Sequence, residues 1–180
     1  MIAERFNGFG ALGLVAVDAQ PLAEIERDYG HDAYLRSLGS LASLVENLVK
    51  DRLSGDELLL TGETGHHELV VLLFRSPSDG EFYRSEMPLF VESLSEALVR
   101  HGHRVVYPYC RKAPIFGTGY TGTLRNPHYG VGTQVRSALE EAREDARLGA
   151  RIEARRRRKE LTGIVLAGAI SSVYEPIVDV

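Results

Sequence analysis

The sequence predicts an α/β (α+β) domain, in which helices pack on a single mixed sheet of about five strands. Two observations lead to this prediction. A continuous apolar run at 11–17, and two further runs within 57–74 that flank a short polar segment, have the pattern of buried strands. Between and after these runs, apolar residues recur at helical spacing. Strands that alternate with crossover helices form one layered sheet.

The expected elements are, in chain order, a strand at 11–17, a short helix at 21–27, a helix at 32–54, a hairpin at 57–74, a helix at 88–100, strands at 105–109 and 115–121, and a helix at 131–148. Asp32 is placed to cap the helix that follows it. Gly62 and Gly65 supply the positive φ angles that a tight hairpin turn needs. Gly102 is expected to end the helix at 88–100.

Composition describes one ordinary domain. The chain has 180 residues, 44% of them hydrophobic, and a net charge of -4, which gives no global attraction to nucleic acid. The single cysteine, Cys110, suits a reducing compartment. No apolar run is long enough to span a membrane, and residues 1–5 lack the order of a signal peptide. A cytoplasmic domain that binds neither nucleic acid nor membrane is the expectation.

Several motifs form an ordered set along the chain. Asp18 ends the first strand, Tyr29-Gly30-His31 follows the short helix, and Gly65-His66-His67-Glu68-Leu69 stands in the hairpin. The set resembles the GGDEF domain of diguanylate cyclases, over roughly residues 10–149. The resemblance implies the GGDEF and nucleotide-cyclase fold, a relative of the ferredoxin-like arrangement.

A diguanylate cyclase joins two GTP molecules and needs divalent cations with hard oxygen ligands. By the resemblance, Asp18 matches one metal carboxylate and His67 takes the place of the other. Imidazole is a poor ligand for magnesium. His66 replaces a glycine whose missing side chain lets the backbone approach phosphates, so its ring is expected to crowd a nucleotide. Glu68 is retained.

The nucleotide contacts of the family are also changed. The basic residue of the first helix becomes Ala23, the guanine-reading residue becomes Glu26, and the second acid of the strand end becomes Gln20. These losses predict no catalytic residues within the Gly65–Leu69 signature and no bound cofactor, with magnesium expected only if nucleotide binds.

Residual nucleotide contact is then confined to Asp18, Gly65 and Glu68, with Asp18 as the residual metal ligand. A structural role is the alternative for two of these residues. Asp18 can cap the following helix, and Gly65 can serve turn geometry alone.

Two further features suggest other ligands. His66, His67 and Glu68 together could hold a transition metal, but neighbouring strand residues point to opposite faces, which disfavours a zinc site. The arginine-rich run at 151–159 could bind phosphates, but glutamates interrupt it. A solvated helix is the favoured interpretation of that run.

The residue composition of the chain changes after Gly149. Residues 150–169 predict a charged linker helix, so the first domain is expected to span 1–149. Residues 170–180, with Tyr174-Glu175-Pro176-Ile177-Val178-Asp179, resemble the opening strand of an EAL domain, in which glutamine usually stands where Glu175 is. The remainder of that domain is expected to be absent, because the chain stops at Val180.

These features together predict a catalytically inactive GGDEF-like module of cyclic di-GMP signalling. It is expected to regulate or contact a protein partner or a downstream EAL domain, or to form a homodimer. GTP and cyclic di-GMP are not favoured as ligands. The alternatives are an active or weakly active diguanylate cyclase with an atypical signature, and a GTP-binding sensor domain.

Overall fold

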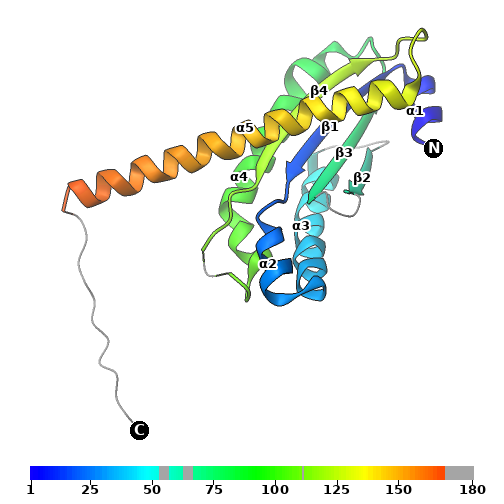
Figure 1. The fold of residues 1–180 in the computed structure, drawn as a ribbon. Coiled ribbons are helices and arrows are strands. Elements are labelled where there is room, and N and C mark those ends of the chain that lie inside the picture. Colours follow the sequence, from blue (N-terminus) through cyan, green and yellow to red (C-terminus); the bar gives the residue numbers. More distant parts are fainter. Residues whose placement is uncertain (53–56, 63–66, 111, 169–180) are drawn as a thin grey trace.

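A four-stranded antiparallel sheet forms the centre of the molecule, with helices on both faces (Figure 1). The computed structural model describes residues 1–52, 57–62, 67–110 and 112–168. The strands lie in the order β2-β3-β1-β4. The elements are α1 (Ile2–Phe9), β1 (Ala11–Asp18), α2 (Leu22–Tyr29), α3 (His31–Arg52), β2 (Glu57–Thr61), β3 (Glu68–Arg75), the π-helix η1 (Phe82–Glu86), α4 (Met87–Val106), β4 (Gly117–Leu124) and α5 (Val131–Leu166).

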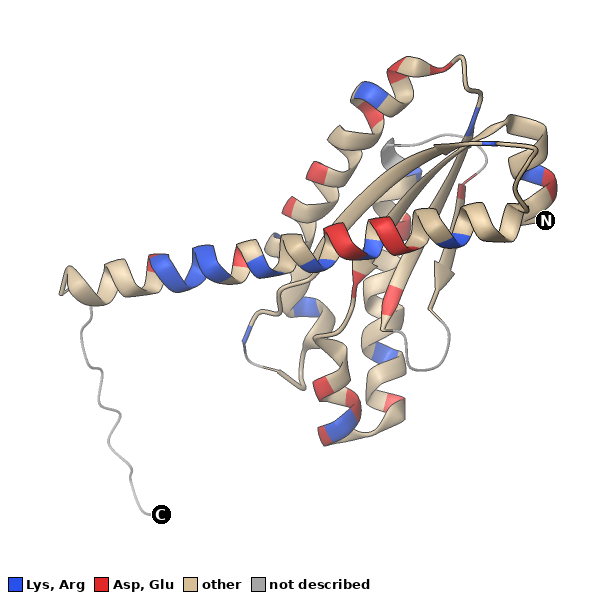
Figure 2. Ribbon diagram, turned by 45° about the horizontal axis from the view of Figure 1, so that its top comes forward, with Lys and Arg blue, Asp and Glu red and all other residues tan. Residues whose placement is uncertain are grey.

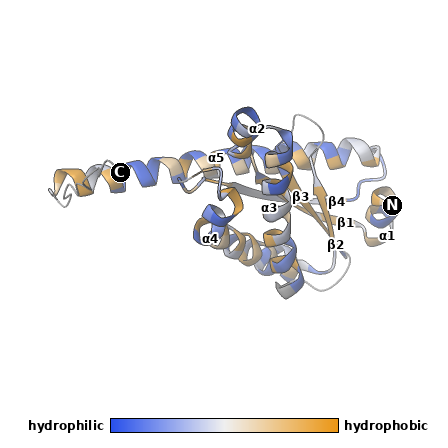
Figure 3. Cartoon of the chain, turned by 90° about the horizontal axis from the view of Figure 1, so that it is seen from below, coloured by the Kyte–Doolittle hydropathy of each residue, from blue (hydrophilic) through white to orange (hydrophobic). Residues whose placement is uncertain are grey.

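The predicted fold class is confirmed, and the sheet accounts for it. The central strands β1 and β3 are buried at all positions but their last, as a sheet covered on both faces requires. Their side chains alternate between two apolar layers. Val15, Val71 and Leu73 belong to the layer beneath α2, α3 and α4, whereas Leu14 and Leu72 belong to the layer beneath α1 and α5. Figure 3 shows the apolar strands held between these helices.

Helix α4 corrects part of the sequence prediction. It continues through Gly102 to Val106, so the expected strand at 105–109 does not form. Val105 and Val106 are buried on the α4 face of the sheet, and Gly102 lies against the ring of Phe116, where an added Cβ would come within 3.3 Å. A short apolar run fits a buried helix end as well as a strand, and packing decided between them.

The sheet therefore differs in detail from the expected one. Within the described residues it has four strands rather than about five, and every pairing is antiparallel rather than mixed. The predicted hairpin forms from β2 and β3. Gly65 and His66 of its connection lie outside the described residues.

Helix α1 was not anticipated. Its residue Phe6 is fully buried in the layer beneath α5. Gly10 ends the helix with a positive φ of 84°, and its backbone N–H donates to the carbonyl of Phe6. The chain thereby turns directly into β1.

Helix α5 is one continuous helix from Val131 to Leu166, and it crosses the expected boundary at Gly149 without a break. Its first half lies on the sheet, and its second half projects from the body of the molecule (Figure 1). The segment expected to open an EAL domain, residues 170–180, lies outside the described residues. No helix in the described part of the chain is long and apolar enough to cross a membrane.

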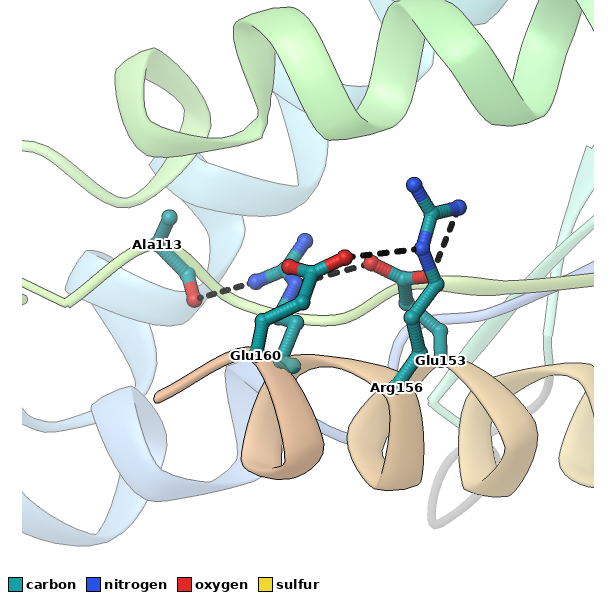
Figure 4. A network of polar contacts seen from close by, with 5 residues as sticks. Ala113, Glu153, Arg156 and Glu160 are labelled. Atoms are coloured by element: carbon teal, nitrogen blue, oxygen red, sulfur yellow. Dashed lines mark hydrogen bonds and ion pairs between the residues drawn. The ribbon is translucent and has the colours of Figure 1, made fainter. Parts of the chain in front are cut away.

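A hydrogen bond ties the start of the projecting half of α5 to the body, and ion pairs join residues within the helix (Figure 4). Arg157 donates to Glu153 one turn earlier and to the backbone carbonyl of Ala113 in the loop before β4. Arg156 pairs with Glu160, one turn later. The arginine-rich run is thus partly neutralised by its own glutamates, as the sequence suggested.

The glycines of β4 set the distance between α5 and the sheet. An ideal Cβ at Gly119 would lie 2.2 Å from the carbonyl oxygen of Ala142, and one at Gly117 would lie 2.0 Å from that of Ala146. Real Cβ atoms do not approach oxygen so closely. The two backbones therefore touch only because both strand positions lack a side chain.

We expect Gly119→Ala to push α5 away from the sheet and to lower the free energy of unfolding by about 3 kcal/mol or more. Gly39→Ala is the matched control, because Gly39 is an exposed α3 position with no atom near its added Cβ. That change should raise stability by up to about 1 kcal/mol. Urea unfolding measures both, and equal effects would contradict the close approach.

Candidate functional site

Asp18 and Glu68 face each other at the end of the central strand pair. They are register partners in the β1–β3 ladder. Directly paired positions of antiparallel strands point to the same face of the sheet. Both carboxylates therefore lie on the face that α5 covers, where Arg143 reaches Glu68. The structure brings these two predicted site residues together.

Arg143 of α5 binds Glu68 with both ends of its guanidinium group. Nε lies 2.7 Å from Oε2 and Nη2 lies 2.5 Å from Oε1, a bidentate geometry. The two side chains are 14% and 11% exposed, so the pair is mostly out of water. Arg143 also donates to Glu140 on its own helix.

The hydrogen bonds that Arg143 donates to the Glu68 carboxylate raise the pKa of Arg143 above its already high usual value. The folded-state pKa lies above the unfolded one, so this stabilising contribution is fully present below the unfolded pKa and is lost only at extreme alkaline pH. Arg143 therefore keeps its charge at any pH at which the protein works.

His67 does not join these carboxylates. It precedes Glu68 by one residue, and its ring lies edge-on against Tyr34 of α3, with the centroids 5.2 Å apart. That contact is on the opposite side of the sheet from Arg143. The backbone carbonyl of His67 accepts a hydrogen bond from Ala19, which fastens the two strand ends together. The histidine has a packing contact where the resemblance places a metal ligand.

Asp18 closes a turn at the end of β1. Its Oδ1 accepts the backbone N–H of Gln20 at 2.9 Å. Helix α2 begins afterwards, with Pro21 at its N-cap and no side-chain cap. Asp18 is therefore not the helix cap that the sequence offered as an alternative, but it orders the residues leading into that helix.

A hollow of about 450 Å³ lies beside these groups. The residues that line it come from the strand ends and from α5, and they include Asp18, Gln20, His67, Glu68, Arg143 and Arg147. This donor set does not fit magnesium, because Glu68 already binds a guanidinium group and an imidazole is no hard ligand. Among the described residues, no three His, Cys, Asp or Glu side chains are grouped to hold a metal ion.

The residues of α2 that the resemblance assigns to nucleotide binding do not take part in the Asp18–Glu68 site. Glu26, at the guanine-reading position of the resemblance, lies with Oε1 2.7 Å from Nδ1 of His31. Between them, Gly30 joins α2 to α3 with a φ of 86°. The Tyr29-Gly30-His31 motif thus forms the joint between two helices, and Ala23 offers no polar group.

The chain matches no protein-family model, and no curated protein sequence is detectably similar to it. Its structure, however, is similar to solved ones. The active GGEEF domain of a diguanylate cyclase from Vibrio cholerae superimposes with a TM-score of 0.55 and 16% identity, over 82% of this chain and 86% of that one. This chain has the fold of a GGDEF domain.

Two further solved structures agree on the fold. An EAL/GGDEF domain protein from M. capsulatus gives a TM-score of 0.51 and 14% identity, over 78% of this chain and 81% of that one. Diguanylate cyclase SiaD from Pseudomonas aeruginosa, in complex with its activator SiaC, gives 0.56 and 16% identity, over 83% of this chain and 54% of that one. The strand-end carboxylates and the hairpin therefore lie within a GGDEF fold.

Sequence reasoning missed Arg143, the residue that defines the electrostatics of this site. It stands 75 positions from Glu68, and nothing in its own helix distinguishes it from the neighbouring arginines. Only the placement of α5 against the sheet selects it.

We expect Glu68→Ala to lower the free energy of unfolding by about 3 kcal/mol, because it leaves the mostly buried charge of Arg143 with only the exposed Glu140 as its partner. The double change Glu68→Met with Arg143→Met should recover most of that loss. Glu46→Ala, which breaks an exposed pair with Lys50, is the control and should cost less than about 1 kcal/mol. A Glu68→Ala cost no greater than that of Glu46→Ala in urea unfolding would contradict the importance of the pair.

Proposed function

We propose that this chain is a catalytically inactive GGDEF-like module of cyclic di-GMP signalling, which acts by contact with a protein partner or a downstream EAL domain. The observation that supports it most is the bidentate grip of Arg143 on Glu68. A cytoplasmic location belongs to the same proposal, since a single cysteine suits a reducing compartment.

The electrostatics at the strand ends argue against turnover. The joining of two GTP molecules requires divalent cations that neutralise the phosphates and the attacking hydroxyl group. These cations need several hard oxygen ligands. Arg143 already neutralises Glu68, and the ring of His67 packs on Tyr34. Asp18 is the remaining carboxylate, and one carboxylate with backbone hydrogen bonding is a weak magnesium site.

The form of the molecule supports a contact function instead. Helix α5 carries the chain from the sheet out into the projecting half (Figure 1), and in the sequence it precedes the residues that resemble the start of an EAL domain. A rigid helix of this kind couples the position of one body to that of whatever follows it. The SiaD structure, solved with its activator SiaC, shows that a protein of this fold is contacted by another protein.

The alternative is a cyclase with an atypical site or a GTP sensor. It draws on one observation: Asp18 and Glu68 stay paired across β1 and β3 beside a hollow that also carries Arg147. Turnover and binding assays separate this alternative from the proposal.

We predict that the protein makes no cyclic di-GMP from GTP and magnesium, because Glu68 is held by Arg143 and His67 supplies no hard ligand. Chromatography of the reaction products measures this against a buffer blank. Product formation above that blank, abolished in Asp18→Ala, would show an active cyclase and overturn the proposal.

We also predict that GTP with magnesium leaves the melting temperature unchanged, since only a ligand that favours the folded state raises it. Thermal denaturation over a range of GTP concentrations provides the measurement, with ATP as the control nucleotide. A rise of several degrees that grows with GTP but not with ATP would instead support the sensor alternative.

A further inference from the structure

Helix α5 carries an exposed stripe that no described part of the chain covers. Its sheet-facing side uses the buried alanines Ala138, Ala142 and Ala146. A second side is exposed and alternates spacings of four and three residues, which is the spacing of contact positions in paired helices. This outer stripe consists of Glu141, Asp145, Leu148, Ile152, Arg155 and Lys159.

The outer stripe is ordered by charge. Its first two residues are acidic and its last two are basic, and Figure 2 shows the acidic segment of α5 followed by the basic one. Leu148 and Ile152 lie between them, 52% and 59% exposed. The stripe therefore has an apolar centre with opposite charges at its two ends.

The charges of the outer stripe are unneutralised within one copy. In the ranges that the structure describes, none of its four charged residues takes part in an ion pair, whereas the neighbouring Arg156 and Arg157 do. Glu141 and Asp145 are one turn apart and repel each other, as do Arg155 and Lys159. A partner that presents the opposite order of charges would remove both repulsions.

We propose that a second copy of this chain is that partner, and that two α5 helices pair antiparallel through their outer stripes. With the two-fold axis between Leu148 and Ile152, Leu148 packs on the partner's Ile152 and Asp145 faces the partner's Arg155. Glu141 then faces the partner's Lys159. A surface that meets itself across a two-fold axis must be self-complementary, and this stripe is.

Other partners or orientations would leave charges of the outer stripe unpaired or facing like charges. A parallel pair would set acids against acids and bases against bases. A nucleic acid or an anionic membrane would attract Arg155 and Lys159 but repel Glu141 and Asp145. The self-pairing deepens the contact function proposed above, with a second copy of the chain as the protein partner, and rests on it. The absence of cyclase activity is tested separately and stands or falls by itself.

Charge reversal on the 180-residue chain tests the pairing. Asp145→Arg places an arginine against the partner's Arg155, and Arg155→Asp places an aspartate against the partner's Asp145. Each variant alone should weaken self-association at least ~10-fold. An equimolar mixture of the two variants should restore it, because arginine at 145 of one chain then meets aspartate at 155 of the other. Sedimentation velocity over a concentration series reads the oligomeric state.

Arg136→Asp is the matched control, since Arg136 is an exposed α5 arginine outside the stripe and the change in charge is the same as in Arg155→Asp. It should leave the dimer intact. Melting curves of the variants verify that each monomer is folded. A wild-type chain that is monomeric throughout, a dimer unaffected by both reversals, or variants that do not recombine in the mixture would each overturn the proposal.

Discussion

The backbone contact between α5 and β4 determines which side chains of α5 face the sheet and which face solvent. Gly117 and Gly119 lie directly beneath the carbonyls of Ala146 and Ala142, at distances that leave no room for a side chain. Contact at two successive turns fixes both the height of α5 above the sheet and its rotation about its own axis. With larger residues at these positions, the helix would sit higher and its side chains would reach different partners.

The rotation of α5 places some of its charged residues against the sheet and others in solvent. Arg143 is turned inward along the sheet and reaches Glu68, where low exposure makes the bidentate pair strong. Leu148 is turned outward, and Asp145, whose Cβ borders Gly119 in the edge strand β4, also remains exposed. One helix therefore neutralises the strand-end carboxylate on one side and presents a self-complementary stripe on another.

The alternation of side chains between the two faces of the sheet, at the start of β3, explains why the described residues there form no group of metal ligands. It accounts for this as fully as the substitutions do. Glu68 and His67 are neighbours in sequence, but they fall on opposite faces of the sheet. One enters the layer beneath α5 and the other meets Tyr34 of α3. Two polar side chains that look like a joint ligand pair in the sequence are thus engaged differently: Glu68 binds Arg143, whereas the ring of His67 packs on Tyr34 and its buried Nδ1 has no hydrogen-bond partner within the described residues.

The sequence by itself determined the buried strands at 11–17 and 57–74, the hairpin and the main helices, because these follow from local periodicity. It did not determine that Asp18 meets Glu68, which the pairing of β1 with β3 decides. It could not determine that Val105 and Val106 end a helix, since a short apolar run fits either structure until its packing partners are known. Nor could it single out Arg143 among many arginines. That choice depends on the glycines of β4, which act across the fold and leave no signal near the residue they position.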